Sequence, residues 1–163
     1  MTAPPGSDPK NRHRRNPSVT AAEPGSAKPM THYLVAYAAT AAAFLLVDFI
    51  WLSQIATRFY FDRIGHLMMD KPNLAVAAVF YAVYVIGILI FAVVPALKAG
   101  SMPTAVLYGA LFGFFAYATY DMTNYATLRD WPIVVAVVDV AWGTALTGFA
   151  AGFGYWATRQ VAG

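Results

Sequence analysis

The 163-residue chain has no cysteine, so it can form no disulfide, no thiolate metal site and no cysteine nucleophile. Charged residues are scarce as well, at 12% of the chain, where an ordinary soluble domain has about 25%. Hydrophobic residues make up 59% of the chain, above the usual share of about 45–50%. Together these features predict an integral membrane protein.

Motifs for nucleotide or nucleic-acid binding are missing too. The sequence has no Gly-rich phosphate loop, no P-loop lysine and no basic patch interleaved with aromatic residues. Its three histidines (His13, His32 and His66) do not have the spacing of paired metal ligands. Asp and Asn oxygens could still hold a hard cation. The sequence therefore predicts no nucleic-acid partner, and gives no positive signal for a metal site or a cofactor.

Residues 1–29 form a tail rich in Pro, Ser, Ala and Gly, with a basic cluster from Lys10 to Arg15. Such a composition buries too little apolar surface to offset the entropy of ordering, so we expect disorder. It is not typical of a signal peptide, because no apolar run follows the basic cluster closely. Met30 immediately precedes the first apolar segment and is an alternative start. We divide the sequence into a disordered tail, 1–29, and a transmembrane domain, 30–163.

Four apolar segments follow, each near the roughly 20 residues that cross a bilayer as a helix. They cover residues 33–57, 74–97, 104–124 and 132–157. The mixed stretch 58–71 has the pattern of a short amphipathic helix in the membrane interface. It is either a plain connection or a gate over a pocket. The predicted fold class is all-α, an integral membrane four-helix bundle with a disordered N-terminal tail.

Four spans place both termini on the same side of the membrane. Seven basic residues lie on that side and four on the other, which predicts cytoplasmic termini by the positive-inside rule. Without the tail, the bias reverses. The side of the termini carries Lys10, Arg12, Arg14, Arg15, Lys28, Lys98 and Arg159, and the opposite side carries Arg58, Arg63, Lys71 and Arg129.

Three carboxylates interrupt the apolar segments. Asp48 lies nine residues before Thr57, and Asp139 lies seven residues after Pro132, or about 13 and 10 Å from the same membrane face. Asp121 ends the third segment at that face. A carboxylate in hydrocarbon must be paired, hydrated or protonated. An antiparallel bundle would bring these three groups together in one half of the membrane.

Residues three or four positions from these carboxylates share a helix face with them. Tyr81 and Tyr84 of the second span enter the same half of the membrane. We predict a one-sided ligand pocket lined by Asp48, Trp51, Tyr81, Tyr84, Tyr117, Asp121, Asn124, Asp139 and Trp142. The alternative is that the Asp residues accept hydrogen bonds from Tyr and Trp and only hold the helices together. The other half of the bundle carries two Gly-x-x-x-Gly spacings, Gly109/Gly113 and Gly148/Gly152, which allow close helix approach.

Several short blocks resemble a bacterial family of small predicted membrane proteins that is catalogued as a domain of unknown function. The blocks are Asp48-Phe-Ile-Trp51, Tyr120-Asp121-Met-Thr-Asn124, Trp131-Pro132 and Asp139-Val-Ala-Trp142-Gly143. The resemblance covers about residues 32–155. It implies a multi-pass four-helix protein of the bacterial cell (inner) membrane, with no established activity. Gene neighbourhoods in that family suggest a link to lipid or fatty-acid modification.

The pocket favours an uncharacterised membrane protein that handles a lipid or another small molecule. One alternative is a membrane-embedded enzyme that uses its Asp carboxylates as acid and base, with catalytic residues unknown. Another is an accessory subunit. The expected partners are membrane lipid and either a second copy or another membrane protein. An intramembrane aspartyl protease is excluded, because Asp139 lacks the Gly-x-Gly before it. A through-channel is disfavoured, because the half near the termini has few polar groups.

Overall fold

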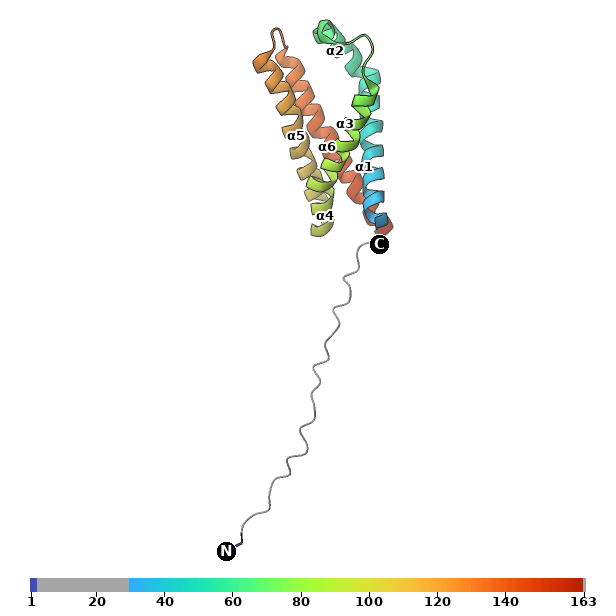
Figure 1. The fold of residues 1–163 in the computed structure, drawn as a ribbon, viewed down its shortest axis with the longest axis vertical. Coiled ribbons are helices and arrows are strands. Elements are labelled where there is room, and N and C mark those ends of the chain that lie inside the picture. The colour runs from blue at the N-terminus through green and yellow to red at the C-terminus, as the bar shows by residue number, and fades with distance from the viewer. Residues whose placement is uncertain (3–29, 163) are drawn as a thin grey trace.

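The computed structural model describes residues 1–2 and 30–162, so the predicted tail disorder lies outside the described residues. Within these ranges every regular element is helical. Four helical rods are long and apolar enough to cross a membrane, and they stand side by side as one bundle (Figure 1). The predicted all-α membrane fold is confirmed.

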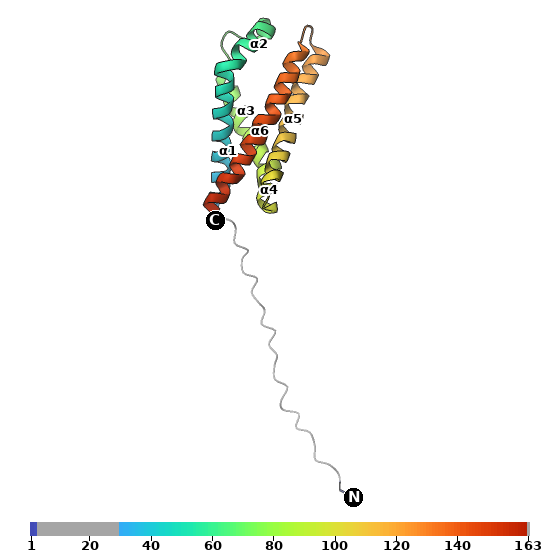
Figure 2. The ribbon, with the colours of Figure 1, turned by 180° about the vertical axis from the view of Figure 1, so that it is seen from behind.

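The first rod is longer than the predicted span 33–57. It runs without a break over Met30–Leu67. A π-helical turn lies at its middle, and there the Thr57 hydroxyl donates to the carbonyl of Leu52 over 2.6 Å. Beyond this turn α2 leans away from the axis of α1 toward the beginning of α6 (Figure 2). The parts of this rod are α1 (Met30–Trp51), η1 (Leu52–Ala56), α2 (Thr57–Ile64) and η2 (Gly65–Leu67).

The other three rods begin and end at residues suited to helix termini. The Asn73 side chain caps the second rod by accepting from Val76 N at 3.1 Å, and the Ser101 side chain caps α5 by accepting from Thr104 N at 3.3 Å. Gly100 adopts φ 63°, the left-handed conformation that glycine allows where the second rod turns into α5. These elements are α3 (Leu74–Ile88), η3 (Leu89–Val93), α4 (Val94–Ala99), α5 (Met102–Thr127) and α6 (Ile133–Ala162).

Helix α6 is the centre of the bundle, since it packs along both α5 and α1. Glycines set the α5–α6 distance. A Cβ on Gly109 would lie 2.6 Å from the Cβ of Ala151, and a Cβ on Gly113 would lie 2.7 Å from the Thr147 hydroxyl oxygen. A Cβ on Gly152 would lie 3.0 Å from its nearest neighbour, a side-chain carbon. Both Gly-x-x-x-Gly pairs therefore face this interface, and the pair on α5 is the tighter one.

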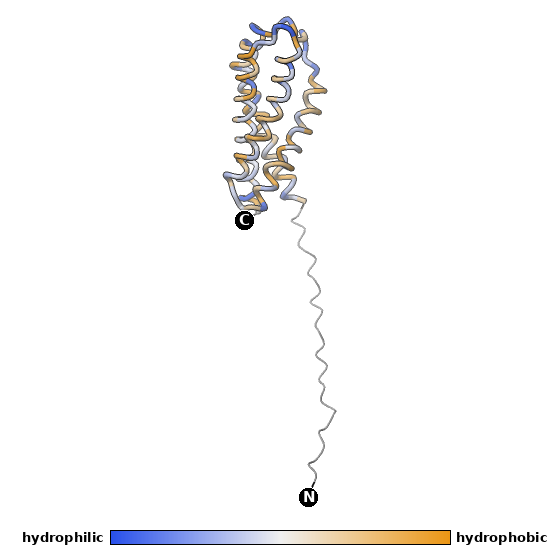
Figure 3. Tube along the Cα trace, turned by 90° about the vertical axis from the view of Figure 1, so that its left-hand side faces the viewer, coloured by the Kyte–Doolittle hydropathy of each residue, from blue (hydrophilic) through white to orange (hydrophobic). Residues whose placement is uncertain are grey.

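The rods converge at the end that carries α4 and the C-terminus, and they spread toward the end that carries α2 (Figures 1 and 2). Tyr84 of α3 and Thr147 of α6 link two rods in the middle by a hydrogen bond of 3.0 Å. Hydrophilic residues gather at the α2 end, where two of the three connections between rods lie (Figure 3). The wide end of the bundle is therefore also its most polar part.

Candidate functional site

A cavity of about 340 Å³ opens at the wide end of the bundle. All four rods contribute to it, together with the turn before α6. Met68 and Tyr120 are exposed side chains on its wall, so the cavity communicates with the surroundings. Its lining consists of Asp48, Trp51, Leu52, Tyr60, Ile64, Met68, Tyr81, Tyr117, Tyr120, Trp131, Asp139 and Trp142.

Asp48 is the most highly connected polar group in the cavity. It lies on α1, and its side chain is only 6% exposed. The Tyr81 hydroxyl of α3 donates to Asp48 Oδ2 over 3.0 Å, and the Trp142 indole N–H of α6 donates to Oδ1 over 3.3 Å. Hydrogen bonds to a charged acceptor are stronger than neutral ones. One carboxylate thus ties three helices together beside the cavity.

Asp139 lies on α6 and is half-buried. The hydroxyl of Tyr60, from α2, donates to Asp139 Oδ1. This contact joins the leaning α2 segment to α6 and keeps it over the cavity. The two carboxylates are therefore held on different helices, by phenols from two further helical segments.

Aromatic rings form most of the remaining wall. Trp51 and Trp142 stack with ring centroids 4.3 Å apart and an interplanar angle of 14°. Tyr120 and Trp131 meet edge to face at 5.9 Å. A Cβ on Gly143 would overlap the ring of Tyr117, so glycine at that position is what allows Tyr117 to lie against α6. Seven of the twelve lining residues are Tyr or Trp.

The charge of the lining has one sign. Asp48 and Asp139 are its two ionisable acids, and among the residues that the structure describes no Lys, Arg or His lines the cavity. Over the same described residues, no group of three or more His, Cys, Asp or Glu side chains comes together as a metal site would require. The donor set therefore does not fit a tightly held metal ion.

A second, mostly apolar cleft lies between α3 and α5 and measures about 750 Å³. It shares four wall residues with the polar cavity, so the two spaces adjoin. Phe80 and Phe112 lie on its apolar part and both pack against Tyr84. The shared residues are Tyr81, Tyr117, Tyr120 and Asp139.

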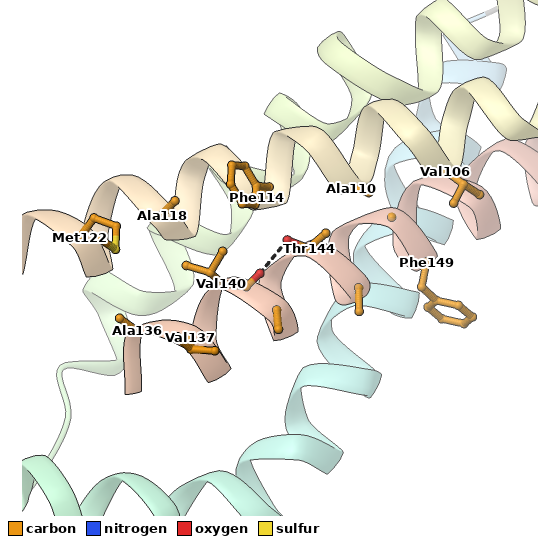
Figure 4. Close-up of a pocket in the computed structure, with 13 residues that line it drawn as sticks. Val106, Ala110, Phe114, Ala118, Met122, Ala136, Val137, Val140, Thr144 and Phe149 are labelled. Atoms are coloured by element: carbon orange, nitrogen blue, oxygen red, sulfur yellow. Dashed lines mark hydrogen bonds between the residues drawn. The ribbon is translucent and has the colours of Figure 1, made fainter. Parts of the chain in front are cut away.

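A third groove runs along the outer side of α5 and α6 and measures about 680 Å³ (Figure 4). Small residues such as Ala110 and Ala118 form its floor, with Phe114 and Phe149 at its edges. The Thr144 hydroxyl within it donates to the Val140 carbonyl over 2.6 Å. With its one hydroxyl satisfied in this way, the groove offers apolar contact and no chemistry.

The comparison with known families agrees with this architecture. The family described as Predicted membrane protein (DUF2177) matches residues 33–156. The chain belongs to this family. Searches of curated proteins and of solved structures found no match. Family membership establishes a predicted membrane protein of unknown function.

Six of the nine predicted pocket residues of this family member line the polar cavity, namely Asp48, Trp51, Tyr81, Tyr117, Asp139 and Trp142. Tyr84 lines the neighbouring cleft instead. Asp121 is fully buried, and neither of its carboxylate oxygens has a hydrogen-bond partner. Asn124 lines neither space, since it lies two helical turns, about 10 Å, farther along α5 than Tyr117. That any of these residues binds a ligand stays a prediction.

The predicted set left out six lining residues. Tyr120 and Trp131 belong to the aromatic stretch around Asp121, so their place in the cavity wall could be inferred from that stretch. Tyr60 and Ile64 come from α2, which the amphipathic pattern marked only as a connection or a gate. The lean of α2 at the π-helical turn brings them to the cavity, and the sequence has no simple signal for its direction.

Proposed function

We propose that this protein binds a small molecule or a lipid headgroup in the polar cavity between Asp48 and Asp139. The observation that supports this proposal is the meeting of two carboxylates from α1 and α6 around one cavity that is accessible through Met68 and Tyr120. The proposal places the ligand at the membrane face opposite the termini.

The cavity volume supports a binding site over simple structural contacts. Carboxylates that only tie helices together need donors, and Asp48 already has Tyr81 and Trp142. They do not need about 340 Å³ of space beside them. Ligand pockets begin near 300 Å³, and a water molecule takes about 30 Å³ of liquid. The space is thus suited to a headgroup-sized ligand.

The proposal includes a location. The family resemblance supports a multi-pass protein of the bacterial inner membrane, and the charge asymmetry of the full sequence supports both termini in the cytoplasm. The cavity would then open to the outer face. Large apolar side chains are exposed on all four rods, which supports lipid as the immediate partner. A second copy or another membrane protein would have to pack against the same apolar surface.

Native mass spectrometry of the protein released from lipid nanodiscs tests the proposal. We expect the wild-type protein to retain a small non-protein mass. Replacing Ile64 with tryptophan (Ile64→Trp) fills the cavity from α2 without touching either carboxylate, and Asp139→Asn removes one charge. Both variants should lose the bound mass. Asp62→Asn, at an exposed position of the same α2, is the matched control and should keep it.

Thermal unfolding of each variant shows that it is folded before its ligand content is compared. The proposal fails if folded Ile64→Trp and Asp139→Asn retain the same mass as the wild type. It also fails if the wild-type protein carries no bound mass. The same spectra report whether one chain or two are present.

A further inference from the structure

We propose that the ligand is an amphiphilic organic ammonium ion, with its ammonium group in the polar cavity and its hydrocarbon tail in the cleft between α3 and α5. This inference rests on the proposed function and names the chemical class that the site accepts. Three features of the described residues lead to it: the charge of the cavity, its aromatic wall and its position beside the apolar cleft.

The charge disfavours anionic headgroups. Asp48 and Asp139 are the charged residues of the wall, and no basic side chain of the described chain lines either space. A phosphate or carboxylate on the ligand would meet these carboxylates without any Arg or Lys to bind it. A cation would neutralise them. The fixed charges therefore select a positively charged group.

The aromatic wall determines which kind of cation fits. Three Trp and four Tyr surround the two carboxylates. Aromatic faces attract ammonium groups, and aromatic cages are the usual way to bind quaternary ammonium ligands. A divalent metal ion would need about six to eight oxygen ligands instead. A bulky organic ammonium can use the rings and the carboxylates together.

The adjoining cleft would hold the hydrocarbon tail of the ligand. Tyr81, Tyr117 and Tyr120 belong to both walls, so the two spaces adjoin at these side chains, and a ligand that occupies both must lie between them. The larger space is mostly apolar, and Phe80 on its wall is exposed at the surface of α3. A tail placed there would reach the bilayer directly. The geometry thus favours entry from the membrane between α3 and α5.

The tryptophan content of the chain supplies a direct readout. Three of its four Trp residues line the cavity, and the fourth, Trp156, is exposed near the other end of α6. In a Trp156→Phe background, the tryptophan fluorescence of this chain comes from Trp51, Trp131 and Trp142 alone, and empty nanodiscs give the scaffold background. Binding in the cavity therefore changes the whole signal rather than a fraction of it.

The experiment titrates this protein, in nanodiscs, with dodecyltrimethylammonium below its micellar concentration. Empty nanodiscs give the partitioning background. The comparison probes are dodecyl tri(ethylene glycol) ether, which has the same tail and no charge, dodecyl sulfate, which has a negative head, and tetramethylammonium, which has no tail. We expect saturable binding of the cationic amphiphile and at least about tenfold weaker binding of the other three. Asp139→Asn should weaken its binding by about tenfold as well, and Asp62→Asn should not.

Equal binding of the uncharged ether would overturn the inference, because the cavity would then not select charge. Tighter binding of the sulfate would overturn it too. If tetramethylammonium bound as tightly as the amphiphile, the role of the α3–α5 cleft would be wrong. Each of these results leaves the proposed function standing if the wild-type protein still carries a bound mass that Ile64→Trp removes, so the two failures are distinguishable.

Discussion

Replacing Asp48 with alanine should destabilise the bundle by about 2–4 kcal/mol. The carboxylate accepts hydrogen bonds from Tyr81 of α3 and Trp142 of α6. Without it, two half-buried donors lose their acceptor, and each unsatisfied donor costs free energy. Alanine also removes the link between three helices. Reversible unfolding in mixed detergent micelles measures the loss.

The matched control for Asp48→Ala is Asp62→Ala, at an exposed position on α2 where the change should cost little. Asp48→Asn keeps one carbonyl oxygen as an acceptor and should fall between the two. If Asp48→Ala costs no more than Asp62→Ala, the hydrogen bonds to Asp48 do not hold the helices together.

Replacing Gly113 with alanine should lower the free energy of unfolding by a comparable amount, through the contact between α5 and α6. A Cβ there would lie 2.7 Å from the Thr147 hydroxyl oxygen and 2.8 Å from its Cβ, and it would also meet the carbonyl oxygen of Gly143. A backbone carbonyl cannot rotate away, so α5 and α6 must separate. Such overpacking costs about 1–3 kcal/mol. It also displaces Thr147, which bonds to Tyr84 of α3.

Gly152→Ala is the control for Gly113→Ala, because it belongs to the other Gly-x-x-x-Gly pair on the same interface. Its Cβ would come within 3.0 Å of a Val106 methyl group and no closer to any atom. Since alanine favours a helix over glycine by up to about 1 kcal/mol, this variant should be nearly neutral. Equal unfolding midpoints for the two variants would contradict the close approach at Gly113.

The helical architecture could be predicted because it depends on properties that the sequence states directly. The length and apolarity of the segments from Leu74 onward define three crossings. The N-termini of α3 and α5 are capped by the side chains of Asn73 and Ser101, residue types that favour this position. The amphipathic pattern of residues 58–71 predicts a helix there, but it does not predict that this helix continues the first rod without a break. The two parts are joined through a π-helical turn, for which hydropathy gives no signal.

Counting residues along a helix predicts how deep in the membrane a side chain lies, and this much of the site could be predicted. Counting residues placed Asp48 and Asp139 in the same half of the membrane, and the structure brings both to one cavity. The rotation of a helix about its own axis is set by its neighbours, and the sequence leaves it open. For that reason Asp121, one turn beyond Tyr117 on α5, is buried away from the cavity although the residue pattern grouped the two.

The proposed function depends above all on a polar cavity that is reached from one side of the membrane. The absence of cysteine from the sequence allows single-cysteine variants to test this without a background. The informative positions are Tyr117 inside the cavity, Met68 at its mouth, Lys98 at the opposite end and Ala150 in the buried core.

The decisive measurement is the reaction of these thiols, in oriented proteoliposomes, with a membrane-impermeant trimethylammonium methanethiosulfonate added to one side at a time. We predict that Tyr117→Cys reacts only from the side that labels Met68→Cys, and that Ala150→Cys reacts from neither. Labelling of Tyr117→Cys from the side that reaches Lys98→Cys, or from no side, would contradict a one-sided cavity.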